Sequence, residues 1–429
     1  MFDQNGLSLD QAPPIHVVLR FFLVGALWGI VAGVWLFFYG SHALEPAHPE
    51  ALILTHILTL GVMFSFMLGA LFQMLPVLAG IAIQTPTQLA IRTQYPLTIG
   101  ILFLLLGFGL GGSTYFILAL FFLVIGLLPA LGLILIRLQK ITAYSAASRG
   151  MTHALFNALI VLGLGVILVG SRSGWWGGEH YLQLRLAHVG YGLLGWIALL
   201  IVSVSFQVVE MFYVTPPYPK TLTRWLTSSI TWLLATSLLS GVYSTTLQSA
   251  LLALAMTGLM LHGAVTLRRF SQRKRPLTDA TVWFWRMSAI ALMVSMLGGI
   301  AQVLTSTPTW VGQMTALFFL FFATSTVLAM AYKIVPFLVW FHLNAQGYFT
   351  APMMHEVIHP KYAMKNLYLH LVSFVVALIA VFYPYAWALA GGLFALSFTW
   401  MGIGIYRGWH RYLDVERTGE KFSFNYLDT

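Results

Sequence analysis

Long apolar runs recur through almost the whole chain, and they constrain its fold more than any other feature. Between Val17 and Arg407 these runs reach about 18 residues or more, and a helix needs about 20 apolar residues to cross a bilayer. Backbone groups in lipid must be satisfied internally, so the chain is predicted to be an all-α membrane protein. Hydropathy predicts about twelve spans. They cover 15–39, 51–79, 96–111, 114–137, 152–170, 182–213, 222–243, 246–267, 281–304, 311–340, 366–384 and 386–407.

Composition agrees with a membrane protein and excludes several kinds of site. Of the 429 residues, 59% are hydrophobic and 8% are charged, whereas a soluble domain has about 25% charged residues. Cys is absent, which excludes disulfides, thiolate metal sites, iron–sulfur clusters and thioether-linked haem. No cleavable signal peptide is predicted, because Asp3 and Asp10 but no basic residue precede the first apolar run.

The net charge of +10 comes from basic loops rather than from a nucleic-acid-binding surface. Basic residues gather at 137–149, 268–275 and 406–411, after the fourth, eighth and twelfth spans. The loops at 41–50 and 171–181 are acidic or nearly neutral. By the positive-inside rule, both termini are expected in the cytoplasm, with the chain in a bacterial inner membrane. The lipid bilayer is the partner that this pattern predicts, and no nucleic acid is expected.

A short pattern recurs three times, each time near the end of a long apolar run. It reads ALFQMLP at 70–76, SVSFQVVE at 203–210 and AMAYKIVP at 329–336. The copies align on Phe72, Phe206 and Tyr332, and these are followed by Gln73, Gln207 and Lys333. The pattern divides one integral membrane domain, 1–429, into three parallel four-helix units of roughly 14–149, 150–275 and 276–412, with a cytoplasmic tail at 413–429. Parallel units of this kind predict a pseudo-threefold axis along the membrane normal.

Two histidines lie at corresponding depths in the second and sixth spans. With the amino terminus inside, His56 and His188 fall near the outer ends of these spans. An ionisable residue within a span is costly and often functional, and imidazole is a common ligand of metals and haem. A lone histidine is as often a packed side chain, but the matched pair favours ligands. The tenth span has no histidine at this depth.

Other polar residues give weaker expectations. Arg185 precedes His188 by three residues on the same helix face, so it is expected either to pair with a haem propionate or to reach the lipid headgroups. The outer-loop histidines are weaker metal candidates: His42, His48 and His180.

Four polar residues lie near the inner ends of the spans that carry the repeated pattern: Gln73, Gln207, Glu210 and Lys333. They predict either a proton path or, as the favoured interpretation, a polar network that locks the helices together. A Lys333–Glu210 ion pair is one expectation from this network.

Two segments resemble subunit I of the haem–copper oxidases. The second span, LTHILTLGVMFSFMLGALFQMLPVLAG, is similar to that family's second helix, where a histidine ligates the low-spin haem. The sixth span, AHVGYGLLGWIALL, is similar to the sixth helix of the C-type members, where a histidine ligates copper. The resemblance implies twelve helices in three arcs, a non-covalent haem of b type on His56, and copper on His188. The seventh and tenth spans lack the family's histidines, so it implies no intact oxygen-reducing centre.

The chain is also similar to the NnrS-type membrane proteins, a divergent branch of that superfamily linked to haem, copper and nitric oxide stress. Their HAHE-type segment is absent, and the corresponding stretch reads ILTHILTLG.

These observations predict a haem-binding redox or gas-responsive membrane protein, with copper as a further expectation. Its partners would be other respiratory-chain subunits or a cytochrome in electron transport, and any enzyme activity would be that of an oxidoreductase. His56 and His188 need not share one iron, because sharing would require the second and sixth spans to flank a single pore. One alternative is a non-catalytic structural or assembly subunit, which the missing ligands favour. The other is a cofactor-free transporter that uses Glu210, Lys333 and Arg20, although no pair of Gly/Pro-broken spans marks a substrate site.

Overall fold

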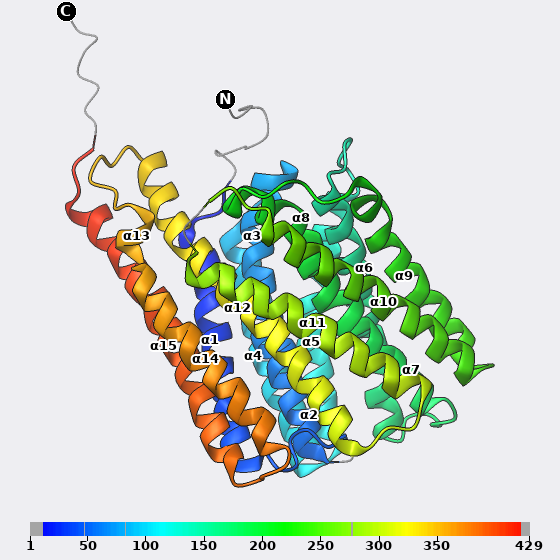
Figure 1. The fold of residues 1–429 in the computed structure, drawn as a ribbon. Helices are drawn as coiled ribbons and strands as arrows, with labels where there is room; N and C mark the ends of the chain where they lie inside the picture. The colour runs from blue at the N-terminus through cyan, green and yellow to red at the C-terminus, as the bar shows by residue number, and fades with distance from the viewer. Residues whose placement is uncertain (1–11, 47, 82, 276–277, 422–429) are drawn as a thin grey trace, which may run out of the picture.

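The fold is a bundle of long helices, seen in a computed structural model that describes residues 12–46, 48–81, 83–275 and 278–421 (Figure 1). The described helices are α1 (Ile15–Tyr39), α2 (Pro49–His56), η3 (Ile57–Phe64), α3 (Ser65–Ala79), α4 (Pro86–Leu110), α5 (Ser113–Leu138), α6 (Ala146–Arg172), α7 (Tyr181–Gly190), η4 (Tyr191–Ala198), α8 (Leu199–Tyr213), α9 (Lys220–Gly241), α10 (Thr245–Ser271), α11 (Ala280–Leu304), α12 (Thr309–Ala345), α13 (Met354–Val357), α14 (Pro360–Ala380) and α15 (Ala386–Thr418). The π-helical segments η3 and η4 continue α2 and α7 without a break, so α2–η3–α3 and α7–η4–α8 each form one rod.

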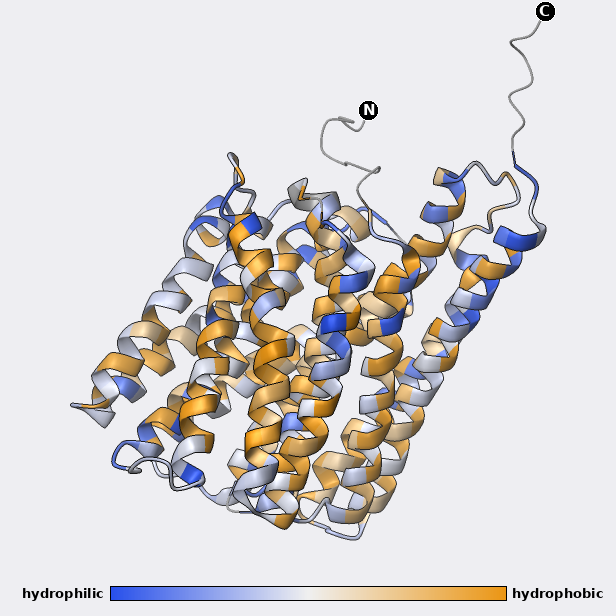
Figure 2. Ribbon diagram, turned by 180° about the vertical axis from the view of Figure 1, so that it is seen from behind, coloured by the Kyte–Doolittle hydropathy of each residue, from blue (hydrophilic) through white to orange (hydrophobic). Residues whose placement is uncertain are grey.

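The helices have the length and apolarity of a multi-pass membrane protein, as the sequence predicts. In the described part of the chain, eleven helices are long and apolar enough to cross a membrane. Hydrophobic residues dominate the middle of the bundle, and hydrophilic ones gather toward the helix ends (Figure 2). Of the twelve predicted spans, the seventh falls below this apolar level, because α9 carries Lys220, Arg224 and many Ser and Thr residues.

The helix boundaries confirm that the third and fourth predicted spans are separate, and they correct the predicted start of the C-terminal tail. The predicted spans at 96–111 and 114–137 are separate helices. Gly111 and Gly112 interrupt the helix, because their φ angles of 75° and 93° lie in a region that favours glycine. The predicted tail, 413–429, begins as helix, because α15 continues to Thr418. Residues 422–429 of that tail lie outside the described residues.

Three rods occupy the centre of the bundle. In the most apolar stretch of each candidate span, 67%, 78% and 67% of the residues are buried for Pro49–Pro76, Tyr181–Tyr213 and Thr309–Ala345. In the other candidate spans this share is 39–50%. The central helices α3, α8 and α12 meet around a small apolar crevice of about 70 Å³, whose walls include Met67, Leu200 and Val327.

The surrounding helices follow one another in a closed order. Helix α5 packs on α6, α10 packs on α11, and α15 packs back on α1, as Figure 1 shows for the two ends of the chain. Within the sequence, α4 packs on α5, α9 on α10, and α14 on α15. The chain therefore returns to its starting helix and encloses the three central rods.

Candidate functional site

The site begins with a local departure from α-helix in two central rods. Segment η3 ends eight residues before Phe72, and η4 ends eight residues before Phe206, so both lie at the same distance from the aligned aromatic residues. The rings of Phe64 and Trp196 stack at 4.7 Å between the two segments. A π-helix has a wider turn than an α-helix and often lies at a functional site. Helix α12, the third central rod, is described as α-helix throughout.

The two π-helical segments bring the rings of His56 and His188 close to one another. His56 is the last residue of α2, directly before η3, and His188 lies three residues before η4. Their ring centroids are 6.4 Å apart, with an angle of 24° between the planes. With metal–nitrogen bonds of about 2 Å and ring centres about 1 Å behind the nitrogens, two imidazoles on opposite sides of one metal have centroids about 6 Å apart. The pair therefore has the spacing of two ligands that share one metal.

The hydrogen bond of His56 sets the ring for ligation. Its Nδ1 donates to the Leu52 carbonyl at 2.7 Å, one turn earlier in α2. A hydrogen bond at one ring nitrogen leaves the lone pair on the other, which is how metal-ligating histidines are oriented. Among the described residues, the Nε2 of His56 has no hydrogen-bond partner.

The wall behind His188 is built from small residues. A Cβ on Gly165 of α6 would lie 3.5 Å from the His188 Cε1, so the ring rests against this helix. The Val161 backbone approaches the same ring, and the buried Nδ1 makes no hydrogen bond of standard geometry with any described residue. Gly192 lies one helical turn further along the rod, and a Cβ there would meet no atom within 4 Å. Gly192 is partly exposed, so no described side chain fills the space on its side of the rod, one turn from His188.

Phe108 lies beside the His56 ring, and Arg172 lies over Phe108. The ring of Phe108, near the end of α4, lies 5.0 Å from the His56 ring. Arg172, the last residue of α6, places its guanidinium carbon 5.9 Å from the centroid of the same Phe108 ring. Arg185 is exposed, one turn before His188. Sequence reasoning missed Phe108 and Arg172, because neither belongs to a motif and only the fold brings α4 and α6 beside the pair.

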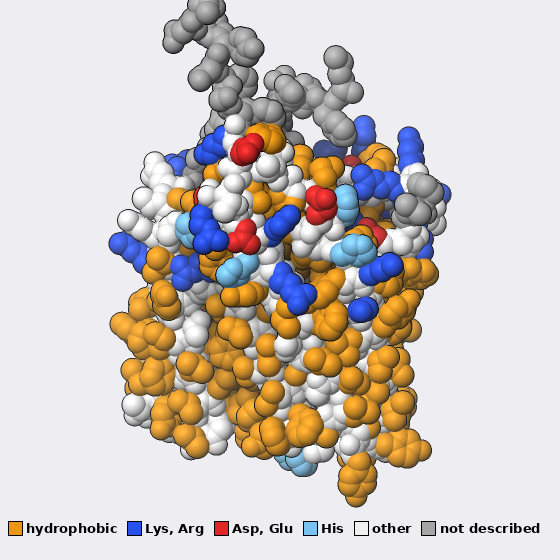
Figure 3. Space-filling view, turned by 90° about the vertical axis from the view of Figure 1, so that its left-hand side faces the viewer, with side chains coloured by type: hydrophobic (Ala, Val, Ile, Leu, Met, Phe, Trp, Pro, Cys, Tyr) orange, Lys and Arg blue, Asp and Glu red, His pale blue; other side chains and the backbone are white. Residues whose placement is uncertain are grey.

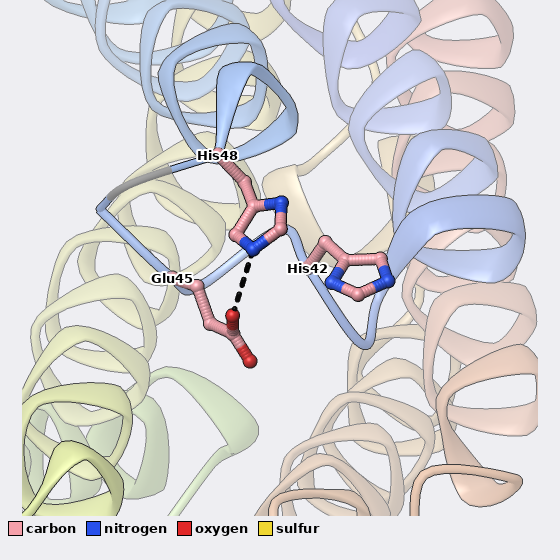
Figure 4. A group of neighbouring side chains, drawn as sticks. All are labelled: His42, Glu45 and His48. Carbon is pink, nitrogen blue, oxygen red and sulfur yellow. Dashed lines mark ion pairs between the residues drawn. The ribbon is translucent and has the colours of Figure 1, made fainter.

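The outer-loop histidines separate into a group and a single residue. His42, Glu45 and His48, in the loop between α1 and α2, are the one group in the described part of the chain whose three potential metal ligands lie within 4.8 Å of one another (Figure 4). His180 is exposed directly before α7 and is not a member of this group.

The predicted ion pair of Lys333 has a different partner. Its Nζ binds the Asp279 carboxylate at 2.6 Å, while Glu210 accepts a hydrogen bond from the Tyr218 backbone N–H at 3.0 Å. The expected Lys333–Glu210 pair is therefore wrong, since the loop before α11 supplies the nearer carboxylate. Burial alone would raise the pKa of Asp279, but the Lys333 ammonium and hydrogen bonds outweigh it and hold that pKa below its usual value.

Among the described residues, the side chains of Gln73 and Gln207 make no hydrogen bond to Lys333 or Glu210. Gln73 is 5% exposed, and neither atom of its amide has a hydrogen-bond partner in the described chain. No direct side-chain hydrogen bond links any two of Gln73, Gln207, Glu210 and Lys333 within the described residues. The predicted polar network is thus not formed by direct contacts among these four side chains.

No protein-family model matches this chain, and no curated protein sequence matches it significantly.

Proposed function

We propose that the protein binds haem between His56 and His188 and serves as a membrane redox protein. The observation that carries this proposal is the 6.4 Å separation of the two ring centroids, which is close to the spacing of about 6 Å for two imidazoles on one metal. The matched π-helical segments η3 and η4 support it, because they place both rings at one depth in neighbouring rods. The proposal differs from the oxidase resemblance, which gives His188 to copper.

The residues around the pair fit a haem. The hydrogen bond from His56 Nδ1 to Leu52 presents Nε2 as the ligand atom. The open space at Gly192 leaves room beside His188 for part of a flat ring, and Phe108 supplies an apolar wall. A haem held there by His56 and His188 would supply one-electron transfer.

The cationic residues near the pair suit the propionates of such a group. Arg172 stands over Phe108, and the exposed Arg185 lies one turn from His188. Guanidinium–carboxylate pairs are strong and directional, so these two side chains would orient a haem with its propionates toward the nearby end of the bundle.

We further propose that the chain consists of three four-helix units around a pseudo-threefold axis, as in the oxidase resemblance. The repeated neighbour pattern supports this, because α5·α6, α10·α11 and α15·α1 each join the last helix of one predicted unit to the first helix of the next. The heavily buried rods around α3, α8 and α12 are the corresponding second helices. The haem ligands would then come from two units, and the third would contribute none.

The test is an absorption spectrum of the full chain, expressed with adequate haem and purified in detergent. We expect a Soret band with about one haem per chain. His56→Ala and His188→Ala should each remove or shift the band, and Gly192→Leu should lower haem content about tenfold or more by filling the open space. His153→Ala is the matched control, because this histidine bonds Ser228 at 2.9 Å, away from the pair.

The outcomes separate the competing functions. Absence of a Soret band in the wild-type protein would sink the haem proposal. One copper per chain that is lost in both histidine variants would assign the pair to copper instead. If the purified protein contains neither haem nor copper and a respiratory complex purifies with it, a structural or assembly subunit would be favoured.

A further inference from the structure

We infer that the loop between α1 and α2 holds a second metal site, in which His42, Glu45 and His48 bind a divalent transition-metal ion of the zinc class. This site lies outside the pair of histidines proposed for haem. Its three ligand atoms lie within 4.8 Å of one another, and all three side chains are at least partly accessible to solvent. A His₂–carboxylate set is a common zinc arrangement that keeps one further position for water.

The backbone of the loop brings the three side chains to one side. The Glu45 N–H donates to the His42 carbonyl at 3.1 Å, and the His48 N–H donates to the Glu45 carbonyl at 2.9 Å. Figure 4 shows the Glu45 and His48 side chains joined by their ion pair, with the His42 ring beside that of His48. Residue 47, within this loop, lies outside the described residues.

Both ends of the loop are tied to helices. The Ala43 N–H donates to the Tyr39 carbonyl at 2.9 Å, and the Ala51 N–H donates to the His48 carbonyl at 3.2 Å. Trp35 Nε1 of α1 donates to the Glu50 carbonyl at 3.1 Å, and Ala43 is 2% exposed. The site is therefore largely organised before an ion binds, which lowers the entropic cost of binding.

The ligand distances suit one small cation. His48 Nε2 lies 3.1 Å from Glu45 Oε2. Ligand atoms about 2.0–2.2 Å from a tetrahedral zinc are about 3.3–3.6 Å from one another, so these two atoms need to move only a few tenths of an ångström apart to fit it. The His42 ring stacks on the His48 ring with centroids 4.6 Å apart, and this exposed side chain has to turn only slightly to bring in the third ligand.

A fourth residue explains why His48 would be the central ligand. Glu50 Oε2 is buried and has no hydrogen-bond partner among the described residues, and it lies 3.9 Å from His48 Nδ1. When Nε2 of a histidine binds metal, its Nδ1–H commonly donates to a carboxylate that fixes the ring. A slight closure toward Glu50 would give that buried oxygen its missing partner. An unpartnered buried carboxylate oxygen is costly, so metal binding would relieve this cost.

The experiment is a calorimetric titration of the purified full chain with zinc chloride at pH 7.5. The wild-type protein is expected to bind one zinc equivalent that the double variant His42→Gln/His48→Gln does not bind. Glu50→Gln should keep the site and weaken its affinity about 10–100-fold, the usual effect of losing an outer carboxylate partner. His180→Gln is the matched control, since it removes an exposed loop histidine outside the group and should leave zinc binding unchanged.

The same titration distinguishes this site from the haem proposal. His56→Ala/His188→Ala should retain the zinc equivalent, while His42→Gln/His48→Gln should retain the Soret band and the thermal unfolding temperature of the metal-free wild type. The inference is overturned if His42→Gln/His48→Gln binds zinc with the stoichiometry and affinity of the wild-type protein. It is also overturned if the wild-type protein binds no zinc.

Discussion

At the scale of single residues, the ion pair of Asp279 and Lys333 links three helices at one point. Asp279 caps α11 by accepting the Val282 N–H at 3.1 Å, and it binds Lys333 of α12 at 2.6 Å. The Lys333 ammonium also lies 5.4 Å from the centroid of the Tyr213 ring of α8. Because the Lys333 side chain is only 20% exposed, loss of its carboxylate would leave a largely desolvated cation without its counter-charge.

We therefore predict that Asp279→Asn destabilises the protein by about 1–3 kcal/mol, the cost of a buried polar group left without its partner. Asn retains the oxygen that caps α11, so the change removes mainly the charge. Asp414→Asn is the matched control, because the Arg417–Asp414 pair is 3.6 Å long, with side chains 79% and 57% exposed. Exposed pairs of this kind contribute about 0–1 kcal/mol. Denaturant unfolding in detergent would measure both, and equal losses would contradict the prediction.

The same pair gives the stability a defined pH dependence. Since the pKa of Asp279 is held below its usual value, its contribution is fully present above the unfolded pKa of 3.8 and is lost as the pH falls through the lower folded value. The wild-type protein should therefore lose more stability than Asp279→Asn between pH 5 and pH 3. An equal loss in both proteins would show that the pair does not contribute.

Residue type and depth were enough to predict His56 and His188 as candidate ligands. They did not predict that the two rings lie 6.4 Å apart. Their positions differ by two residues relative to the aligned aromatics Phe72 and Phe206, so the sequence alone left open whether they share a metal. The ring separation depends on which rods are neighbours and on where each rod departs from α-helix. Asp279 was missed for a similar reason, because its partner Lys333 lies on another helix. Glu45 was missed although its partner is local, since only the turn between Glu45 and His48 brings their side chains together.

At the scale of elements, α1 and α15 approach so closely that glycine is required on both. A Cβ on Gly391 would lie 2.3 Å from the Phe37 backbone nitrogen and 2.6 Å from the Gly33 carbonyl oxygen. A Cβ on Gly33 would lie 2.4 Å from the Ala395 backbone nitrogen. Small residues let helix backbones pack this tightly in membranes, where dispersion contacts drive association.

We predict that Gly391→Leu separates the two helices and lowers stability by about 1–3 kcal/mol or more, the usual cost of overpacking. Gly392→Leu is the control on the next residue, since a Cβ there has its nearest neighbour at 3.8 Å, an ordinary contact with Phe37. Thermal unfolding in detergent would compare them. Equal unfolding temperatures for the two variants would show that the α1–α15 contact tolerates expansion.

The apolar periodicity predicted the existence of the central rods but not their π-helical segments. Ile57–Phe64 and Tyr191–Ala198 contain Gly61 and Gly195 at corresponding positions, yet glycine is frequent in ordinary membrane helices as well. A π-helical turn is stabilised by packing between rods, here by the Phe64–Trp196 stack, and that contact is not local in sequence. The repeated pattern marked the right helices, while tertiary packing determines their geometry.

At the scale of the whole molecule, charge is distributed unevenly between the two ends of the bundle. Space-filling views show Lys and Arg gathered at one end, and hydrophobic side chains along the rest of this face (Figure 3). This basic end includes Lys140 and Lys274 in loops, and Lys220 and Lys361 in the first turns of α9 and α14. The opposite end carries the loop of His42, Glu45 and His48 and the start of α7. By the positive-inside rule, the basic end should face the cytoplasm and both proposed metal sites should lie toward the outer face.

The absence of native cysteine allows this orientation to be tested directly. Gly177, in the exposed loop before α7, and Ser271, at the end of α10 on the basic end, are both exposed. In intact cells, a membrane-impermeant maleimide should label Gly177→Cys but should label Ser271→Cys only after the membrane is opened. If only Ser271→Cys is labelled in intact cells, the protein has the opposite orientation in the membrane. That orientation would also place the histidine pair near the cytoplasmic face, so that an electron donor would have to reach the protein from that side.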